Sequence, residues 1–135
     1  MIIDTSVIVK WFYEEAETPI ALRLFDRIIN HSIRAAVPDL MFYEFANVMK
    51  SKGRADGVDV EEALTVLYEL PWTIMSHTQH LLTKAINVAD LYEISVYDAT
   101  YVGLALEWHL PLITADEKLV HKVGNSNIQL LRNFS

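Results

Sequence analysis

Four acidic residues stand among apolar neighbours, where an unpaired carboxylate is costly. Asp4 and Asp116 each follow a run of apolar residues typical of a buried strand, and Asp98 opens a long apolar stretch. Glu44 has large apolar residues on both sides. Burying one ionised carboxylate costs free energy, and several together repel one another. No Lys or Arg is near enough in sequence to pair with Asp98 or Glu44 through a local helix contact, so another compensating charge is expected.

A hard divalent cation would supply that charge, because Mg²⁺ and Mn²⁺ favour carboxylate oxygens and water. The chain has no cysteine and its five histidines are scattered, which argues against zinc. His77 and His80 are three residues apart but flank the start of a predicted helix, where a surface or capping role is expected. The four acids therefore point to a magnesium or manganese site.

Each acid also has a purely structural interpretation, which the sequence leaves open. Asp4 and Asp116 would serve as helix N-caps, and Asp98 as an acid in a first helical turn, stabilised by the helix dipole. Glu44 is the hardest to explain in this way, because acids inside a helix among Phe and Tyr are uncommon. The other acidic residues are expected on solvated faces.

Strands and helices are predicted to alternate along the chain. Thr5 or Ser6 is expected to cap the first helix, Asp39 to cap the third and Gly53 to end it. The strands are predicted at 1–3, 34–38, 72–75, 111–114 and 128–131. The helices are predicted at 6–12, 17–31, 40–52, 59–70, 78–92, 97–108 and 116–123.

This alternation predicts right-handed βαβ units and an α/β fold with a parallel sheet covered on both faces. In such sheets, functional sites form outside the carboxyl ends of the strands. The chain has 135 residues, 52% of them hydrophobic, and shows no repeat or linker, so 1–135 is expected to be a single domain.

Composition excludes several classes of protein. Without cysteine there is no disulfide scaffold, thiolate zinc site or cysteine nucleophile. The first residues show no basic segment or cleavage site, so no signal peptide is expected. The apolar run 94–106 is too short to span a bilayer and contains Asp98. A cytoplasmic protein without a membrane partner is therefore expected.

The net charge of −7 argues at first against a nucleic-acid partner. A carboxylate site filled by divalent cations would cancel part of that charge. Six of the eleven Lys and Arg residues form two groups along the sequence. For these groups, solvated helix surface and phosphate contact both stay open. These groups are Lys50, Lys52 and Arg54, and Arg23, Arg27 and Arg34.

The chain resembles PIN domains, in particular the VapC ribonuclease toxins of toxin–antitoxin pairs and their archaeal relatives. The resemblance covers nearly the whole chain and rests on four motifs in this order. They are Ile2-Ile-Asp4-Thr-Ser6-Val-Ile-Val-Lys10, Pro38-Asp-Leu-Met-Phe-Tyr-Glu44-Phe-Ala-Asn47, Val96-Tyr-Asp98-Ala-Thr-Tyr101-Val and Pro111-Leu-Ile-Thr114-Ala-Asp116.

The resemblance implies a three-layer α/β/α sandwich with a central parallel sheet of four to five strands. It implies that the four acids converge at one end of the sheet, bind Mg²⁺ or Mn²⁺ and hydrolyse RNA phosphodiester bonds. It also implies a homodimer and a cognate antitoxin protein that blocks the site.

Phosphodiester hydrolysis needs an activated water and relief of charge on the phosphate, and a divalent cation supplies both. On this hypothesis Asp4 and Asp98 are the main metal ligands, while Asp116 and Glu44 complete or orient the ligand set. Hydrogen bonds that hold the carboxylates are expected from Ser6, Asn47 and Thr114. Lys10 or the basic group 50–54 would contact phosphates.

Two other enzyme or signalling classes also place acidic residues after a first strand, but their further requirements are not met. A haloacid-dehalogenase-like phosphatase requires a second Asp at the position occupied here by Ser6. A phospho-receiver domain requires an acidic pair after the first strand and a Lys at a strand end, and neither is evident in this sequence. A non-catalytic PIN-fold interaction domain and a housekeeping RNA-processing nuclease remain as alternatives.

Overall fold

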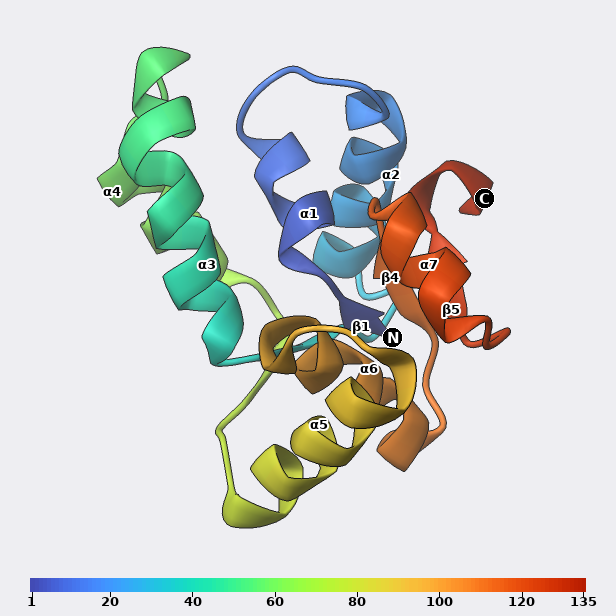
Figure 1. Ribbon diagram of the computed structural model, residues 1–135. Coiled ribbons are helices and arrows are strands. Elements are labelled where there is room, and N and C mark those ends of the chain that lie inside the picture. Colours follow the sequence, from blue (N-terminus) through green and yellow to red (C-terminus); the bar gives the residue numbers. More distant parts are fainter.

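The computed structural model describes all of residues 1–135 and contains a five-stranded parallel sheet (Figure 1). The spatial order is β3-β2-β1-β4-β5, and every neighbouring pair is parallel. The strands are β1 (Ile2–Ile3), β2 (Ala36–Pro38), β3 (Thr73–Met75), β4 (Leu112–Thr114) and β5 (Ile128–Leu130). The predicted α/β fold with a parallel sheet is confirmed.

Helices cover the sheet on both sides, with α1 and α2 on one side of β1 and α5 and α6 on the other (Figure 1). The helix α6 packs against β1, β2 and β4, which explains why it is apolar nearly all round. The helical segments are α1 (Thr5–Ile8), α2 (Thr18–Ile29), α3 (Leu40–Val48), α4 (Val60–Glu69), α5 (Gln79–Tyr92), α6 (Val96–Trp108) and α7 (Glu117–Val123), with 3₁₀ turns η1 (Val9–Trp11) and η3 (Leu131–Asn133) and a π-helical turn η2 (Met49–Gly53).

The direction of chain winding reverses at β1. From β1 the chain adds β2 and then β3 on one side, and it then crosses back to add β4 and β5 on the other. Where the strand order reverses, the connections leave in opposite directions and open a crevice at the carboxyl ends of the strands. Here that crevice lies beyond the ends of β1 and β4.

The core is apolar on both faces of the sheet. The strand residues Ile2, Ile3, Leu112 and Ile113 are fully or almost fully buried, as expected for a parallel sheet with helices on each face. No helix has both the length and the hydrophobicity that a membrane span requires.

Two predicted helix boundaries and one predicted side-chain cap are wrong. Gly53 does not end the third helix: the π-helical turn η2 carries the chain through it, helical residues continue to 55, and Gly57 at φ +80° is the left-handed terminator. Asp39 stands before α3, but its side chain does not cap it, because its carboxylate binds His77 instead. The residue at the N-cap of α1 is Asp4 and not Thr5 or Ser6.

Candidate active site

The carboxyl ends of β1 and β4 open onto a cavity of about 330 Å³ that contains all four predicted acids. The four come from separate parts of the fold: after β1, within α3, at the start of α6 and just before α7. The structure therefore brings together residues up to 112 positions apart in the sequence, counted from Asp4 to Asp116. The lining residues are Asp4, Thr5, Ser6, Val9, Glu44, Asn47, Val48, Asp98 and Asp116.

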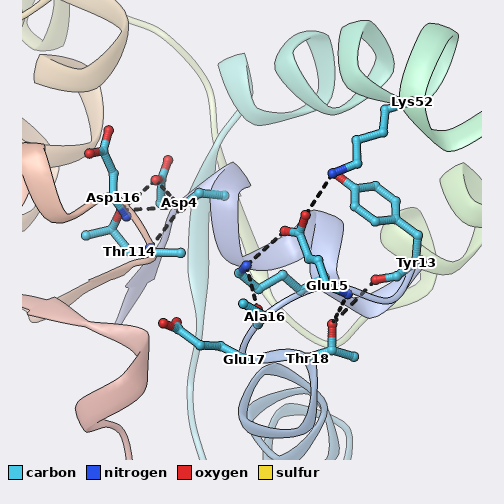
Figure 2. Close-up of polar contacts among 12 residues, drawn as sticks. Asp4, Tyr13, Glu15, Ala16, Glu17, Thr18, Lys52, Thr114 and Asp116 are labelled. Carbon is cyan, nitrogen blue, oxygen red and sulfur yellow. Dashed lines mark hydrogen bonds and ion pairs between the residues drawn. The ribbon is translucent and has the colours of Figure 1, made fainter.

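Asp4 is the most enclosed of the four, with 8% of its surface exposed. Its Oδ2 accepts hydrogen bonds from Ser6 Oγ at 2.6 Å and Thr114 Oγ1 at 2.8 Å. Figure 2 shows Asp4 beside Thr114 and Asp116. Burial raises the pKa of Asp4 to about 6, the hydroxyls of Ser6 and Thr114 oppose that rise, and the charges of Glu44 and Asp98 add to it.

The two hydroxyl groups also join Asp4 to the end of β4. Ser6 Oγ accepts a hydrogen bond from the Ala115 N–H at 3.0 Å, and Thr114 Oγ1 accepts one from the Asp116 N–H at 3.1 Å. Hydrogen bonds of this kind fix the orientation of a carboxylate. Asp4 and the backbone that carries Asp116 are therefore held as one unit.

Glu44 is held by two residues that the sequence analysis did not single out. Its Oε1 accepts hydrogen bonds from Tyr101 Oη at 2.6 Å and Thr5 Oγ1 at 3.1 Å. Burial raises the pKa of Glu44, these two hydrogen bonds lower it, and the charge of Asp98 raises it further. Tyr101 stands three residues after Asp98 on α6, a spacing that places both on one helix face, and this was the available sequence signal.

Tyr101 acts as a hydrogen-bond donor in this cluster. It is 1% exposed, and burial followed by the negative charges of Glu44 and Asp4 raises the pKa of its phenol. A phenol held in its protonated form donates to a carboxylate and cannot serve as a base near neutral pH. Its hydroxyl also lies 2.7 Å from Thr5 Oγ1, so one polar cluster connects α1, α3 and α6.

The remaining two acids stand at helix starts. Asp98 lies in the first turn of α6, where its N–H donates to Ser95 Oγ at 3.0 Å. Burial and the charge of Asp116 raise the pKa of Asp98, and the ammonium group of Lys122 opposes them. Asp116 caps α7, with its Oδ1 accepting from the Leu119 N–H at 3.1 Å. The structural interpretation of Asp116 thus holds, while the same residue also lines the cavity.

The other predicted residues have different surroundings. Asn47 lines the cavity one helical turn after Glu44 and is exposed. His77 and His80 lie on the surface and pair with Asp39 and Glu107, outside the cavity, as their predicted surface role required.

The suggestion that Lys10 contacts phosphates is wrong. Lys10 is 7% exposed, and its ammonium group donates to Glu15 Oε1 and to the Ala16 carbonyl, both at 2.8 Å. The second oxygen of Glu15 binds Lys52 at 3.0 Å (Figure 2). This carboxylate therefore joins two lysines. Because the chain folds back after η1, the charge of Lys10 is neutralised by Glu15 within the protein and is not available to a phosphate.

The donor set of the cavity suits a hard cation. Every polar side chain lining it offers oxygen. The charges of neighbouring carboxylates raise the pKa of Asp4, Glu44 and Asp98. As the side chains stand, no three His, Asp or Glu residues form a ready ligand set for a metal ion. The cavity therefore has the right chemistry for Mg²⁺ or Mn²⁺, and closing around an ion would need rotation of side chains.

The fold and this cavity define an α/β protein with an acidic site at the switch point of a parallel sheet. The profile of the PIN domain matches residues 1–125, and the chain belongs to the PIN-domain family. This confirms the family resemblance predicted from the four motifs.

Two curated relatives match about nine-tenths of both chains. The protein called ribonuclease VapC1 of Mycobacterium tuberculosis is 26% identical over 126 residues, covering 91% of this chain and 90% of its own length. Ribonuclease VapC3 of Pyrobaculum aerophilum is 28% identical over 127 residues, covering 90% and 93%.

Solved structures share the fold. PAE2754 from Pyrobaculum aerophilum superposes with a TM-score of 0.72 at 21% identity, covering 97% of this chain and 90% of its own. A chain of a toxin–antitoxin complex from Klebsiella pneumoniae superposes with a TM-score of 0.68 at 18% identity, covering 96% of both. At these identities the superpositions show the common architecture.

Proposed function

We propose that this protein, with residues 1–135 as one PIN domain, is a ribonuclease that hydrolyses RNA phosphodiester bonds with Mg²⁺ or Mn²⁺. We propose further that it is the toxin of a toxin–antitoxin pair acting in the cytoplasm. The observation that carries the proposal is the single cavity lined by Asp4, Glu44, Asp98 and Asp116. The names of the relatives, ribonucleases in sequence and a toxin–antitoxin complex in structure, support the same activity.

In this proposal Asp4 and Asp98 are the main ligands of the cation, and Asp116 and Glu44 complete or orient the ligand set. When bound, the cation would lower the pKa of a water molecule and offset the charge of the phosphate. The raised pKa of buried Asp4 supports a cation here, because a positive charge would favour the ionised carboxylate.

The residues around the acids have positioning roles. Ser6 and Thr114 hold Oδ2 of Asp4, which leaves Oδ1 free of the hydrogen bonds that fix its partner oxygen. Tyr101 and Thr5 both hold Oε1 of Glu44. Asp4 and Glu44 thus each keep a second oxygen for a ligand or a water molecule, while the first oxygen is held by hydrogen bonds.

The test is cleavage of a panel of labelled structured RNAs by purified protein with Mg²⁺, Mn²⁺ or EDTA. The wild type should cleave with either metal and stop in EDTA, and Asp98→Asn and Asp4→Asn should each lose cleavage while the fold persists. Asp90→Asn is the matched control, because Asp90 is an exposed carboxylate on α5 outside the cavity. Equal metal-dependent cleavage by wild type and Asp98→Asn would defeat the assignment.

We also propose a homodimer and an antitoxin partner. Tyr43 and Tyr97, 78% and 63% exposed, flank an apolar groove of about 270 Å³ next to the acids on α3 and α6. Contiguous exposed apolar surface of this kind is typical of interfaces. Light scattering should show a dimer for the wild type and a monomer for Tyr97→Asp, and a wild-type monomer at high concentration would contradict the dimer.

The antitoxin would lay an apolar helix or an extended segment over the acidic cavity, with an arginine reaching the carboxylates. A small protein encoded next to this one is the candidate to co-express. Inhibition of cleavage in the co-purified complex is the expected result, and full activity of that complex would contradict the partnership.

A further inference from the structure

The outer face of α7 has a hollow of about 590 Å³ lined mainly by basic side chains. Lys118, His121 and Lys122 come from α7, and Arg132 comes from η3. Glu117 is the one acidic residue in the lining. Such a face is unusual on a chain whose net charge is −7, and the sequence analysis did not identify it.

Two of these charges are not cancelled inside the protein. Arg132 is paired with Glu117 and, at 3.6 Å, with Glu17. The side chain of Lys118 is exposed and takes part in no ion pair. Lys122 donates to the Glu93 carbonyl at 3.0 Å, and this neutral acceptor leaves its positive charge available.

The basic hollow adjoins the acidic cavity. Asp116, which lines the cavity, directly precedes Glu117, which lines the hollow, so the two adjoin at the start of α7. Lys122 reaches the Glu93 carbonyl at 3.0 Å, in the turn that leads into α6, on whose first turn Asp98 lies.

We propose that Lys118 and Lys122 on α7 hold backbone phosphates of the RNA strand that flank the bond lying at the acidic cavity. Residues four apart on a helix lie on one face, with their Cβ atoms about 5–6 Å apart, so the two ammonium groups serve neighbouring phosphates. This inference rests on the proposed ribonuclease function. It explains how an acidic protein retains RNA: the positive charge is concentrated beside the site, where phosphate contacts set the register of the strand.

The test is binding of fluorescein-labelled single-stranded RNA in EDTA, followed by anisotropy over a range of KCl concentrations. Each lost phosphate contact lowers the slope of log K against log salt by about 0.7 for a single strand. Lys118→Gln should lower the slope by about 0.7, and Lys118→Gln/Lys122→Gln by about 1.4, with weaker binding to every sequence. The control is Arg23→Gln/Arg34→Gln, which removes the same charge from two exposed positions. Neither arginine lines the acidic cavity or the basic hollow, and Arg34 precedes β2, at the edge of the sheet opposite the cavity. This variant should therefore bind as the wild type does, which also tests the phosphate-contact interpretation that the sequence left open for this arginine group.

The outcomes separate this inference from the proposed function. A wild type that binds and cleaves RNA, with a lysine double variant indistinguishable from the arginine control, overturns the phosphate-binding role alone. A wild type that neither binds nor cleaves any RNA overturns both. Replacing Lys122 also removes its hydrogen bond to the Glu93 carbonyl and could shift the α5–α6 turn. The single Lys118→Gln variant leaves that bond intact, so a weaker salt dependence in this variant reports the loss of a phosphate contact alone.

Discussion

Replacing Asp4 by Asn should make the metal-free protein more stable at neutral pH while removing its response to metal. The pKa of Asp4 is raised from 3.8 to about 6, chiefly by burial. The stability that the neutral carboxyl contributes is fully present below pH 3.8 and is lost as the pH rises through about 6. At pH 7.5 the ionised Asp4 therefore destabilises the fold, and an uncharged amide would not.

The size of the effect follows from the same two pKa values. The interval between 3.8 and about 6 corresponds to roughly 3 kcal/mol, at about 1.4 kcal/mol for each tenfold change. For a chain of 135 residues, an entropy of unfolding of about 2.1 cal/mol/K per residue converts this to about 10 °C in Tm. Both figures are upper limits, because the substitution also weakens the hydrogen bonds that Oδ2 of Asp4 accepts from Ser6 and Thr114.

The assay is urea and thermal unfolding in EDTA between pH 4 and pH 8, repeated with Mn²⁺. In EDTA, the free energy of unfolding of Asp4→Asn should exceed that of the wild type at pH 7.5 and equal it near pH 4. Saturating Mn²⁺ should add about 2.7 kcal/mol to the wild type at 100 times the dissociation constant and little to the variant. The exposed control Asp90→Asn should stay within about 0.5 kcal/mol of the wild type throughout.

The result that would refute the reasoning is an Asp4→Asn protein that is less stable than the wild type in EDTA at pH 7.5. It would mean that the hydrogen bonds from Ser6 and Thr114 outweigh the cost of burying the charge. The carboxylates would then need no cation to compensate them.

Three further substitutions test the supports of the acids. Tyr101→Phe should cost about 1.5–3 kcal/mol in urea unfolding and reduce cleavage, because Glu44 loses a buried donor; unchanged stability would show that this bond is not needed. Thr114→Val should cost about 1–3 kcal/mol, since Thr114 serves both Asp4 and the Asp116 N–H, and a fully active variant would contradict the positioning role. Ser95→Ala should cost about 1 kcal/mol by removing the cap of α6, with a lower kcat as Asp98 loosens; an unaltered kcat would contradict that link.

The sequence predicted the positions of the acids because each belongs to a local pattern. Asp4 and Asp116 follow buried strands, and parallel strands bring their carboxyl ends to one edge. Asp98 and Glu44 stand out because their neighbours are apolar. Local patterns of this kind also gave the order and approximate bounds of the strands and helices.

Contacts between distant segments were beyond such patterns. Glu44 is held by Thr5, 39 residues away, and by Tyr101, 57 residues away, and the partners of a hydroxyl group leave no local trace. The sequence suggested that Lys10 is available to bind phosphate. In the structure the chain folds back after η1, and Glu15 forms an ion pair with Lys10. Gly53 looked like a helix end because glycine commonly ends helices, whereas the structure continues through a π-helical turn there.

The most direct test of the acidic cavity as a cation centre is a Mn²⁺ titration followed by electron paramagnetic resonance. The spectrum of free Mn²⁺ should diminish as wild-type protein or Asp90→Asn binds the ion, and Asp4→Asn and Asp98→Asn should leave it nearly unchanged. Equal binding by all four proteins, or no binding by the wild type, would contradict the account.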